Sequence, residues 1–292
     1  MATIYYLASR NIKVYLRDRA AVFFSLLSVF IIIGLYAIFL GSTTTRSLET
    51  MAGKVDGVRW VVDSWIMAGI MVVNSITVTL GVFGTMIEDE SRKRMSGFLV
   101  APVSRGKLVA GYLAAAIVVG VLLSLVALVL AEIYIIANGG HLLTLPALIK
   151  VLGLLVYNVL ASSCLVFFLI SWIRTASGFS TLSTILGTII GFITGIYLPI
   201  GVLPEALQTV IKFIPATHAA ALMRQIIMEA PLAQVFSLAP PAARLEFSTI
   251  FGVQLFLNNK EIMPLTMLAV IGGSGLLFLA LSIIRMSRRK LG

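Results

Sequence analysis

The sequence predicts an all-α integral membrane protein with six transmembrane helices, on the basis of its composition and its long apolar runs. Hydrophobic residues make up 59% of the 292 residues, charged residues make up 12%, and the mean hydropathy is +1.05. A water-soluble domain of this composition would expose a very large apolar surface. Six runs are long enough to cross a hydrocarbon layer of about 30 Å as helices. Because these runs are continuous rather than alternating, they are not the strands of a membrane barrel.

Six spans are expected, separated by shorter polar segments. They cover residues 20–40, 64–87, 108–137, 151–173, 175–198 and 262–284. The first run follows polar-rich residues and has no small-x-small cleavage site, so we expect a retained span rather than a signal peptide. Residues 1–292 are therefore expected to form a single transmembrane domain.

Residues 1–19 precede the first span and predict an amphipathic helix on the membrane surface. Arg10, Lys13 and Arg17 share one side of this helix. The opposite side carries the apolar groups Ile4, Tyr5, Ala8, Ile12, Tyr15 and Leu16. A helix of this pattern binds the membrane interface through its apolar face. We expect it to anchor the chain, or to act as a lever that passes motion from a partner into the first span.

Short helices are expected between spans five and six, in residues 199–261. Pro199 breaks the fifth span, Pro204 suits the first turn of a new helix, and Pro215 ends that helix. About ten residues cannot cross the bilayer, so this helix would lie in the outer interface or form a re-entrant element. A second short helix is expected over 219–228, and 229–261 would complete an outer cap.

The distribution of basic residues predicts the orientation of the chain. About twice as many of the 22 Lys and Arg residues fall on the side of the N-terminus as on the other side. Basic residues favour the cytoplasmic side, so both termini and residues 88–107 are expected there. Topology and attraction to anionic membrane lipids then explain the net charge of +10, and no nucleic acid partner is expected.

Residues 88–107 form an unusually polar segment between two apolar spans. Three acids are followed closely by three bases, then by an apolar turn and a proline. We expect this cytoplasmic loop to dock a soluble partner, and a plain solvated loop is the alternative. The candidate coupling residues are Glu88, Asp89, Glu90, Arg92, Lys93, Arg94, Gly97 and Pro102.

Polar side chains inside the spans are candidates for a substrate pathway. Asn74 and Thr77 lie near the middle of span two, and Glu132 lies near the outer end of span three. Buried amides, hydroxyls and carboxylates need partners in a membrane. These side chains either hydrogen-bond between helices or line a path for the substrate.

Glycines in span five predict close helix packing. Gly187, Gly191 and Gly195 recur at steps of four residues. This spacing places a glycine strip on one helix face, where the backbone of another helix can approach closely. The partner helix would belong either to the same chain or to a second copy.

The chain lacks the motifs of an enzyme. A P-loop needs GxxxxGK[ST], and neither Gly53-Lys54 nor Gly106-Lys107 is followed by Ser or Thr. HExxH and GxSxG are missing, and the single cysteine, Cys164, lies inside a span. We therefore expect no catalytic residue, cofactor or metal site in this chain. Six spans suggest transport powered by a separate ATPase, and a secondary transporter or channel without an ATPase partner is the alternative.

Two stretches resemble the membrane subunit, or permease, of type-2 ABC transporters. The first is ESRKRMSGFLVAPVSRGKLVAGYL at 90–113, which is similar to the coupling region of that family. The second is GIYLPIGVLPEALQTVIKFIPATHAAALMRQIIM at 195–228, which is similar to its C-terminal signature. With the amphipathic helix, the resemblance covers nearly the full length. One departure is that 229–261 is longer than in the plainest members.

The resemblance implies a permease of the bacterial drug and polysaccharide exporter family, in the plasma membrane. Two permeases, expected as a homodimer with a heterodimer as the alternative, would bind two cytoplasmic ABC ATPase subunits, and those subunits would hold ATP and magnesium. Closure of the ATPase subunits would push on 88–107 and on the N-terminal helix, switching a central cavity between inner and outer access. Spans one, two and five would line the pathway or the dimer contact. Short outer loops and a largely uncharged interior favour an amphiphilic or apolar cargo, such as a drug, a lipid or a hydrophobic peptide.

Overall fold

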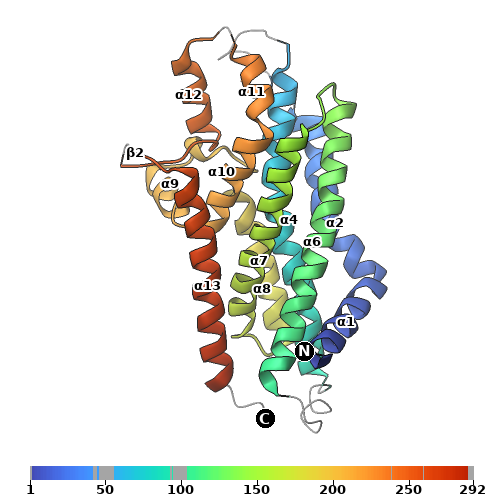
Figure 1. Ribbon diagram of the computed structural model, residues 1–292. Helices are drawn as coiled ribbons and strands as arrows, with labels where there is room; N and C mark the ends of the chain where they lie inside the picture. The colour runs from blue at the N-terminus through green and yellow to red at the C-terminus, as the bar shows by residue number, and fades with distance from the viewer. Residues whose placement is uncertain are drawn as a thin grey trace.

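The expected all-α membrane fold is confirmed by the computed structural model, which describes residues 2–41, 45, 56–92, 94, 104–237, 239–258 and 260–288. Within this part of the chain, six helices are long and apolar enough to cross a membrane. They are α2 (Arg19–Leu35), α4 (Val58–Ser91), α6 (Arg105–Ala137), α7 (Leu145–Ile170), α8 (Ala176–Ile193) and α13 (Pro264–Arg288). The helices run side by side in one bundle, whose lower end in Figure 1 holds the end of α13 and the start of α6.

Helix α4 is the buried centre of the bundle. The most apolar window of α4 is 89% buried, whereas the corresponding windows of α2 and α8 are only 17% and 11% buried. Helices α6, α7, α2 and α8 all pack against α4. Helix α4 carries the buried polar groups Asp63, Asn74 and Thr79, and polar side chains in a membrane protein turn toward the bundle interior, which explains the central place of this helix. The wide apolar faces of α2 and α8 are left open.

The N-terminal helix α1 (Ala2–Arg17) packs chiefly against α6 and also contacts α2 and α4. Leu7, Ala8, Asn11 and Tyr15 are buried, while Tyr5 and Tyr6 are each 70% exposed. The expected apolar side is thus divided: Ala8 and Tyr15 face protein, and Tyr5 faces outward. Asp18 separates α1 from α2, because its carboxylate accepts a hydrogen bond from the Ala21 N–H at 2.9 Å and caps the start of α2.

The end of α8 corrects the expectation for the glycine strip. Helix α8 ends at Ile193, and Gly195 lies beyond it with φ of +71°. The Gly195 N–H donates to the Phe192 carbonyl at 3.1 Å, and the Ile196 N–H donates to the Gly191 carbonyl at 2.9 Å. This pair of bonds is a Schellman cap, in which glycine tolerates the left-handed backbone. Gly195 is therefore a helix terminator, and it does not share a helix face with Gly187.

The other two glycines differ from each other. A Cβ at Gly191 would collide with the ring of Tyr197, so the chain itself fills that space. A Cβ at Gly187 would meet nothing within 4 Å. Only Gly187 leaves an open surface on α8 for another helix.

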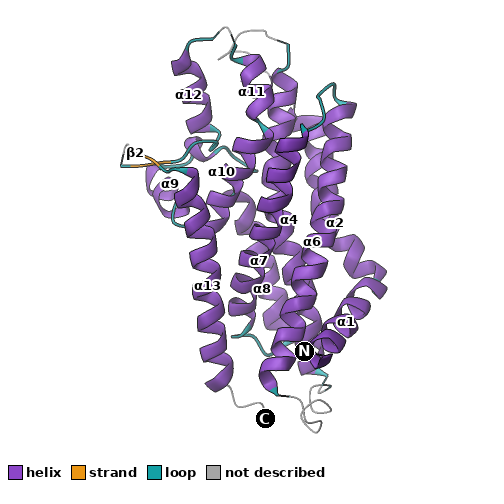
Figure 2. Ribbon diagram, viewed as in Figure 1, coloured by secondary structure: helices purple, strands orange, loops and turns teal. Residues whose placement is uncertain are grey.

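Short elements fill the upper end of the bundle (Figures 1 and 2). They are the π-helical turn η1 (Tyr36–Leu40) at the end of span one, η2 (Ile200–Val202), α9 (Glu205–Ile211), α10 (Pro215–Ile227), α11 (Glu229–Val235), α12 (Pro241–Ile250), β1 (Phe256–Leu257) and β2 (Lys260–Glu261). Strands β1 and β2 pair antiparallel. Helix α10 is the most deeply packed of these helices, since it contacts α4, α7 and α13. Within residues 229–261, expected only to complete an outer cap, the described part of the chain folds into α11, α12 and this hairpin.

The cap at Gly195 yields a stability prediction. Replacing Gly195→Ala forces a side chain into the left-handed region and brings its Cβ to 2.9 Å from the Ile200 side chain. We expect the free energy of unfolding to fall by about 1–2 kcal/mol. Gly273→Ala is the matched control, because Gly273 lies inside α13 with nothing within 4 Å of its added Cβ. Unfolding in detergent micelles should separate the two variants, and equal stabilities would contradict the assignment of the cap.

Candidate functional site

The carboxylate of Asp89 forms the centre of a charged cluster at the lower end of α4. Helix α4 continues to Ser91, so the acids at 88–90 lie in its last turns and not in a loop as expected. Asp89 is only 2% exposed. It follows the buried Val82 and Met86 at helical spacing, so it continues the packed face of the helix. That spacing is the signal in the sequence that could have placed Asp89 inside rather than on a surface.

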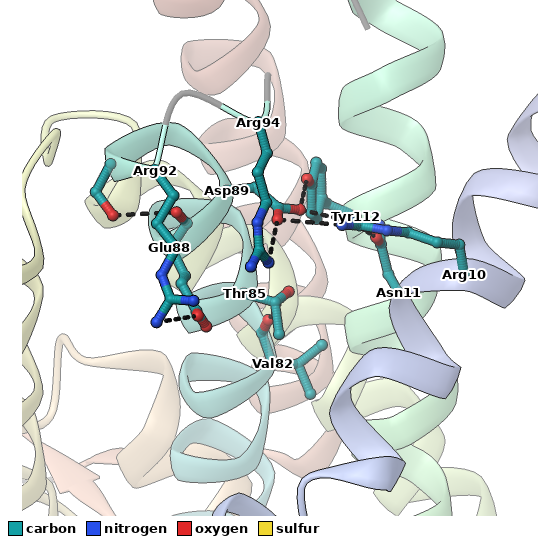
Figure 3. Close-up of polar contacts among 10 residues, drawn as sticks. Arg10, Asn11, Val82, Thr85, Glu88, Asp89, Arg92, Arg94 and Tyr112 are labelled. Carbon is teal, nitrogen blue, oxygen red and sulfur yellow. Dashed lines mark hydrogen bonds and ion pairs between the residues drawn. The ribbon is translucent and has the colours of Figure 1, made fainter. Parts of the chain in front are cut away.

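Two helices supply the direct partners of Asp89. Arg10 of α1 donates from Nη2 to Oδ1 at 3.1 Å and from Nη1 to Oδ2, and the two bonds form a bidentate pair. Tyr112 of α6 donates its hydroxyl proton to Oδ2 at 2.7 Å. Figure 3 shows these side chains converging on the carboxylate from three helices. A bidentate guanidinium–carboxylate pair fixes geometry as well as charge.

Further groups complete the cluster. The Arg94 guanidinium lies 3.6 Å from Asp89 Oδ1, and Arg10 Nη1 also donates to Asn11 Oδ1 at 2.9 Å. Hydrogen bonding from Arg10 to the Asp89 carboxylate raises the pKa of Arg10 above its ordinary value, against the opposing effect of burial. Arg10 therefore stays charged at any physiological pH. The cluster joins α1, α4 and α6 at one point.

The neighbouring candidate residues are placed differently. Glu88 and Arg92 pair across one helical turn at 3.0 Å, and their side chains are 46% and 61% exposed. An exposed pair of this kind stabilises the fold by less than about 1 kcal/mol, so both charges stay available to other groups. Glu90 is half-buried. Lys93, Gly97 and Pro102 lie outside the described residues.

A second ion pair holds α4 against α6 at the opposite, upper end. Arg59 Nε donates to both carboxylate oxygens of Asp63 at 3.1 Å. Arg59 Nη2 also donates to the hydroxyl of Tyr134 in α6 and to Oδ1 of Asn138, the C-cap of α6, each at 3.1 Å. Asp63 is 1% exposed. Each end of α4 thus has a buried aspartate that is paired with an arginine and linked to the tyrosine-bearing helix α6.

The structure does not bring the three pathway candidates together. Asn74 is fully buried and donates to Ser124 Oγ of α6 at 3.3 Å. The hydroxyl of Thr77 donates to the Val73 carbonyl of its own helix at 3.1 Å. Glu132 lies about 12 Å further along α6 than Ser124 and accepts a hydrogen bond from the Leu143 N–H at 3.2 Å. Within one chain, Asn74 joins two helices, and Glu132 belongs to the upper end.

Arg224 of α10 is a buried charge that the sequence reasoning did not single out. It is 0% exposed, and its Nη2 donates to the Thr194 carbonyl at 2.8 Å. Its guanidinium carbon lies 5.1 Å from the centre of the Trp65 ring, at a distance suited to a cation–π contact. Burial lowers the pKa of Arg224 to about 9, so it is still charged at neutral pH. Among the described residues, no carboxylate pairs with it and its Nε and Nη1 have no hydrogen-bond acceptor. Arg224 thereby ties α10 to α4 and to the end of α8.

The Asp89 cluster predicts an energetic coupling between α1 and α4. Asp89→Asn and Arg10→Gln should each lower the free energy of unfolding by about 2–3 kcal/mol, between the values for exposed and fully buried pairs. The double variant should lose less free energy of unfolding than the sum of the two single losses, and the difference is a coupling energy of about 1–3 kcal/mol. Denaturant titration in micelles measures the free energy of unfolding of the unmodified protein, the two single variants and the double variant, which together form a double-mutant cycle.

Glu88→Gln is the control for that cycle, since it removes an acid one residue away whose pair is exposed. We expect a loss below about 1 kcal/mol. Additive effects of Asp89→Asn and Arg10→Gln would contradict a direct pair.

Comparison with known protein families agrees with this architecture. The family model of the ABC-2 type transporter matches residues 2–228, from α1 through the end of α10. No curated protein matches the chain. The matched region contains the Asp89 cluster, the central helix α4 and the buried Arg224. The chain therefore belongs to the ABC-2 type transporter family and is a membrane-spanning permease subunit of an ABC transporter.

Proposed function

We propose that this permease subunit exports an amphiphilic or apolar compound, driven by two cytoplasmic ATPase subunits that bind ATP and magnesium. The observation that carries the proposal is the Asp89 cluster at the lower end of the bundle. It joins the N-terminal helix, the central helix α4 and helix α6 through one buried carboxylate. A force applied to any one of these three helices at this end would be transmitted to the other two.

The exposed charges beside the cluster are suited to receive that force. Glu88 and Arg92 are solvated on the last turns of α4, directly next to Asp89. A soluble ATPase that bound these charges would pull or push on a helix that is buried along most of its length. Because packed helices move as rigid elements, such a displacement would reach the opposite end of the bundle.

The open faces of α2 and α8 support a second copy of the chain as partner. Both helices pack against α4 on one side and expose apolar side chains such as Phe24, Ile31 and Ile185 on the other. Gly187 allows close approach of another helix on the open side of α8. In a homodimer, these faces would enclose a pathway in which alternating access operates, and an apolar wall suits an amphiphilic cargo.

The orientation of the chain follows from its charges in this proposal. Basic residues at the lower end, such as Arg10, Arg92 and Arg94, favour the cytoplasmic side. Both termini would then lie in the cytoplasm of a bacterial cell, and α11 and α12 would lie outside the plasma membrane.

The proposal predicts how the chain and its variants behave with an ATPase partner. The purified chain should hydrolyse no ATP, and co-expression with an ABC ATPase encoded beside it should give a stable complex with ATPase activity. In that complex, Arg10→Gln should lower transport into or out of vesicles by about tenfold or more while ATP hydrolysis continues, because α1 is no longer tied to α4. This corresponds to about 1.4 kcal/mol of lost coupling.

Arg17→Gln is the matched control, since Arg17 is an exposed arginine of the same helix and has no ion pair in the described part of the chain. It should transport normally. Robust hydrolysis by the chain alone, or flux driven by an ion gradient without ATP, would instead favour a secondary transporter. Full transport by Arg10→Gln would remove the proposed coupling role of the cluster.

A further inference from the structure

Two adjoining hollows lie on the upper half of the bundle, on either side of Lys150. The first has a volume of about 360 Å³ and lies between α4, the α6–α7 turn and the α10–α11 segment. The second has a volume of about 660 Å³ and lies between α7, α10 and α13. Lys150 and Ile226 line both hollows, so the two are neighbours. Neither belongs to the Asp89 cluster at the other end.

The first hollow is lined by groups that bind an ammonium ion. Glu132 and Glu229 line it together with Trp60 and His141. The two rings meet edge to face, with centroids 5.0 Å apart. Carboxylates accept hydrogen bonds from an ammonium, and the face of a tryptophan attracts a cation.

Ser64 adds a buried polar side chain to the wall of this hollow. It is 1% exposed and lies on the wall of the hollow, and its Oγ has no hydrogen-bond partner among the described residues. A buried hydroxyl without a partner is unusual, because its desolvation is not compensated. Glu132 has a second free site as well, since the Leu143 N–H occupies only Oε2. A donor placed in the hollow would satisfy the second oxygen of Glu132.

The second hollow is an apolar groove that faces the membrane. Its wall consists of Gly153, Leu154, Tyr157, Leu222, Ile226, Pro264 and Leu268, with Lys150 and Gln225 as its other polar neighbours. Leu268 of α13, which lines this groove, is 36% exposed. In a bilayer, such a groove is in contact with hydrocarbon chains.

The order of these groups along α7 matches one class of molecule. Thr144, Pro146 and Ala147 line the polar hollow, Lys150 lies at the junction, and Gly153 to Tyr157 line the apolar groove. From Lys150 to Tyr157 the helix rises about 10 Å toward the middle of the bundle. Amine-binding groups, a cation for phosphate and an apolar groove therefore follow one another from the upper end inward.

We propose that this paired site binds a zwitterionic phospholipid that carries a primary amine. The ammonium lies in the hollow and donates to Glu132 and Glu229, the phosphate pairs with the Lys150 ammonium, and an acyl chain fills the groove beside α13. Two carboxylates disfavour an anionic headgroup such as glycerol phosphate. Lys150 and the groove distinguish this lipid from a free amine. The site is separate from the faces of α2 and α8, so it does not depend on the proposed export function.

Native mass spectrometry of the purified full chain, titrated with individual lipids in detergent, tests the proposal. Phosphatidylethanolamine should bind about tenfold more tightly than phosphatidylglycerol, which is the effect of about one charge-assisted hydrogen bond. Dodecylamine, which has an amine and a chain but no phosphate, should bind more weakly than phosphatidylethanolamine. Equal binding of the two phospholipids would overturn the headgroup assignment.

Variants locate the site and separate its two charges. Glu229→Gln should abolish the preference for phosphatidylethanolamine over phosphatidylglycerol. Lys150→Met should weaken the binding of both phospholipids and leave the binding of dodecylamine unchanged. Glu205→Gln and Lys260→Met are matched controls, because both residues are exposed at the upper end and neither lines these hollows. The unfolding temperature of each variant in lipid-free detergent shows that the fold is retained. The proposed site would be overturned if Glu229→Gln kept the preference for phosphatidylethanolamine. It would also be overturned if Glu205→Gln or Lys260→Met lost that preference.

Discussion

The buried carboxylate of Asp89 is the constraint on which the lower end of this permease depends. A carboxylate that leaves water needs partners, and here they come from outside its own helix: Arg10 from α1 and Tyr112 from α6. Removing Arg10 would leave the buried carboxylate of Asp89 without its bidentate partner, so the positions of the three helices depend on one another through this cluster. The N-terminal helix is thus part of the folded bundle and is more than an anchor on the membrane surface.

Helix α4 carries this constraint through the molecule. Asp63 at its other end is also buried and paired, and Tyr134 links that pair to α6 by accepting a hydrogen bond from Arg59. Between the two ends, Asn74 and Ser124 form a polar contact in the same helix pair. Arg224 adds a connection from α4 to α10 and to the end of α8. A displacement at the lower end therefore has a continuous route to the upper helices, along a rigid element with buried polar contacts at several levels.

The six spans could be predicted from sequence because their length and hydropathy follow directly from the thickness of a membrane. The role of Asp89 could not, since its partner Arg10 is far away in the chain and only the tertiary fold brings them together. Periodicity placed Gly195 on a helix, but its positive φ and its capping bonds depend on where α8 ends. Similarly, the hollow around Glu132 is built by three segments that are far apart in the chain, and the sequence could show only that a carboxylate lies near a helix end.

The distance between α1 and α6 during the ATP cycle tests the central claim most directly. Spin labels at Tyr6→Cys and Leu122→Cys, on exposed positions in a Cys164→Ala background, report this distance by electron–electron resonance. If the Asp89 cluster joins the helices into one moving body, the distance is the same in the nucleotide-free and ATP-trapped complexes and changes only when Arg10→Gln is added. A shift of several ångströms between the two states of the otherwise unmodified complex would contradict the account.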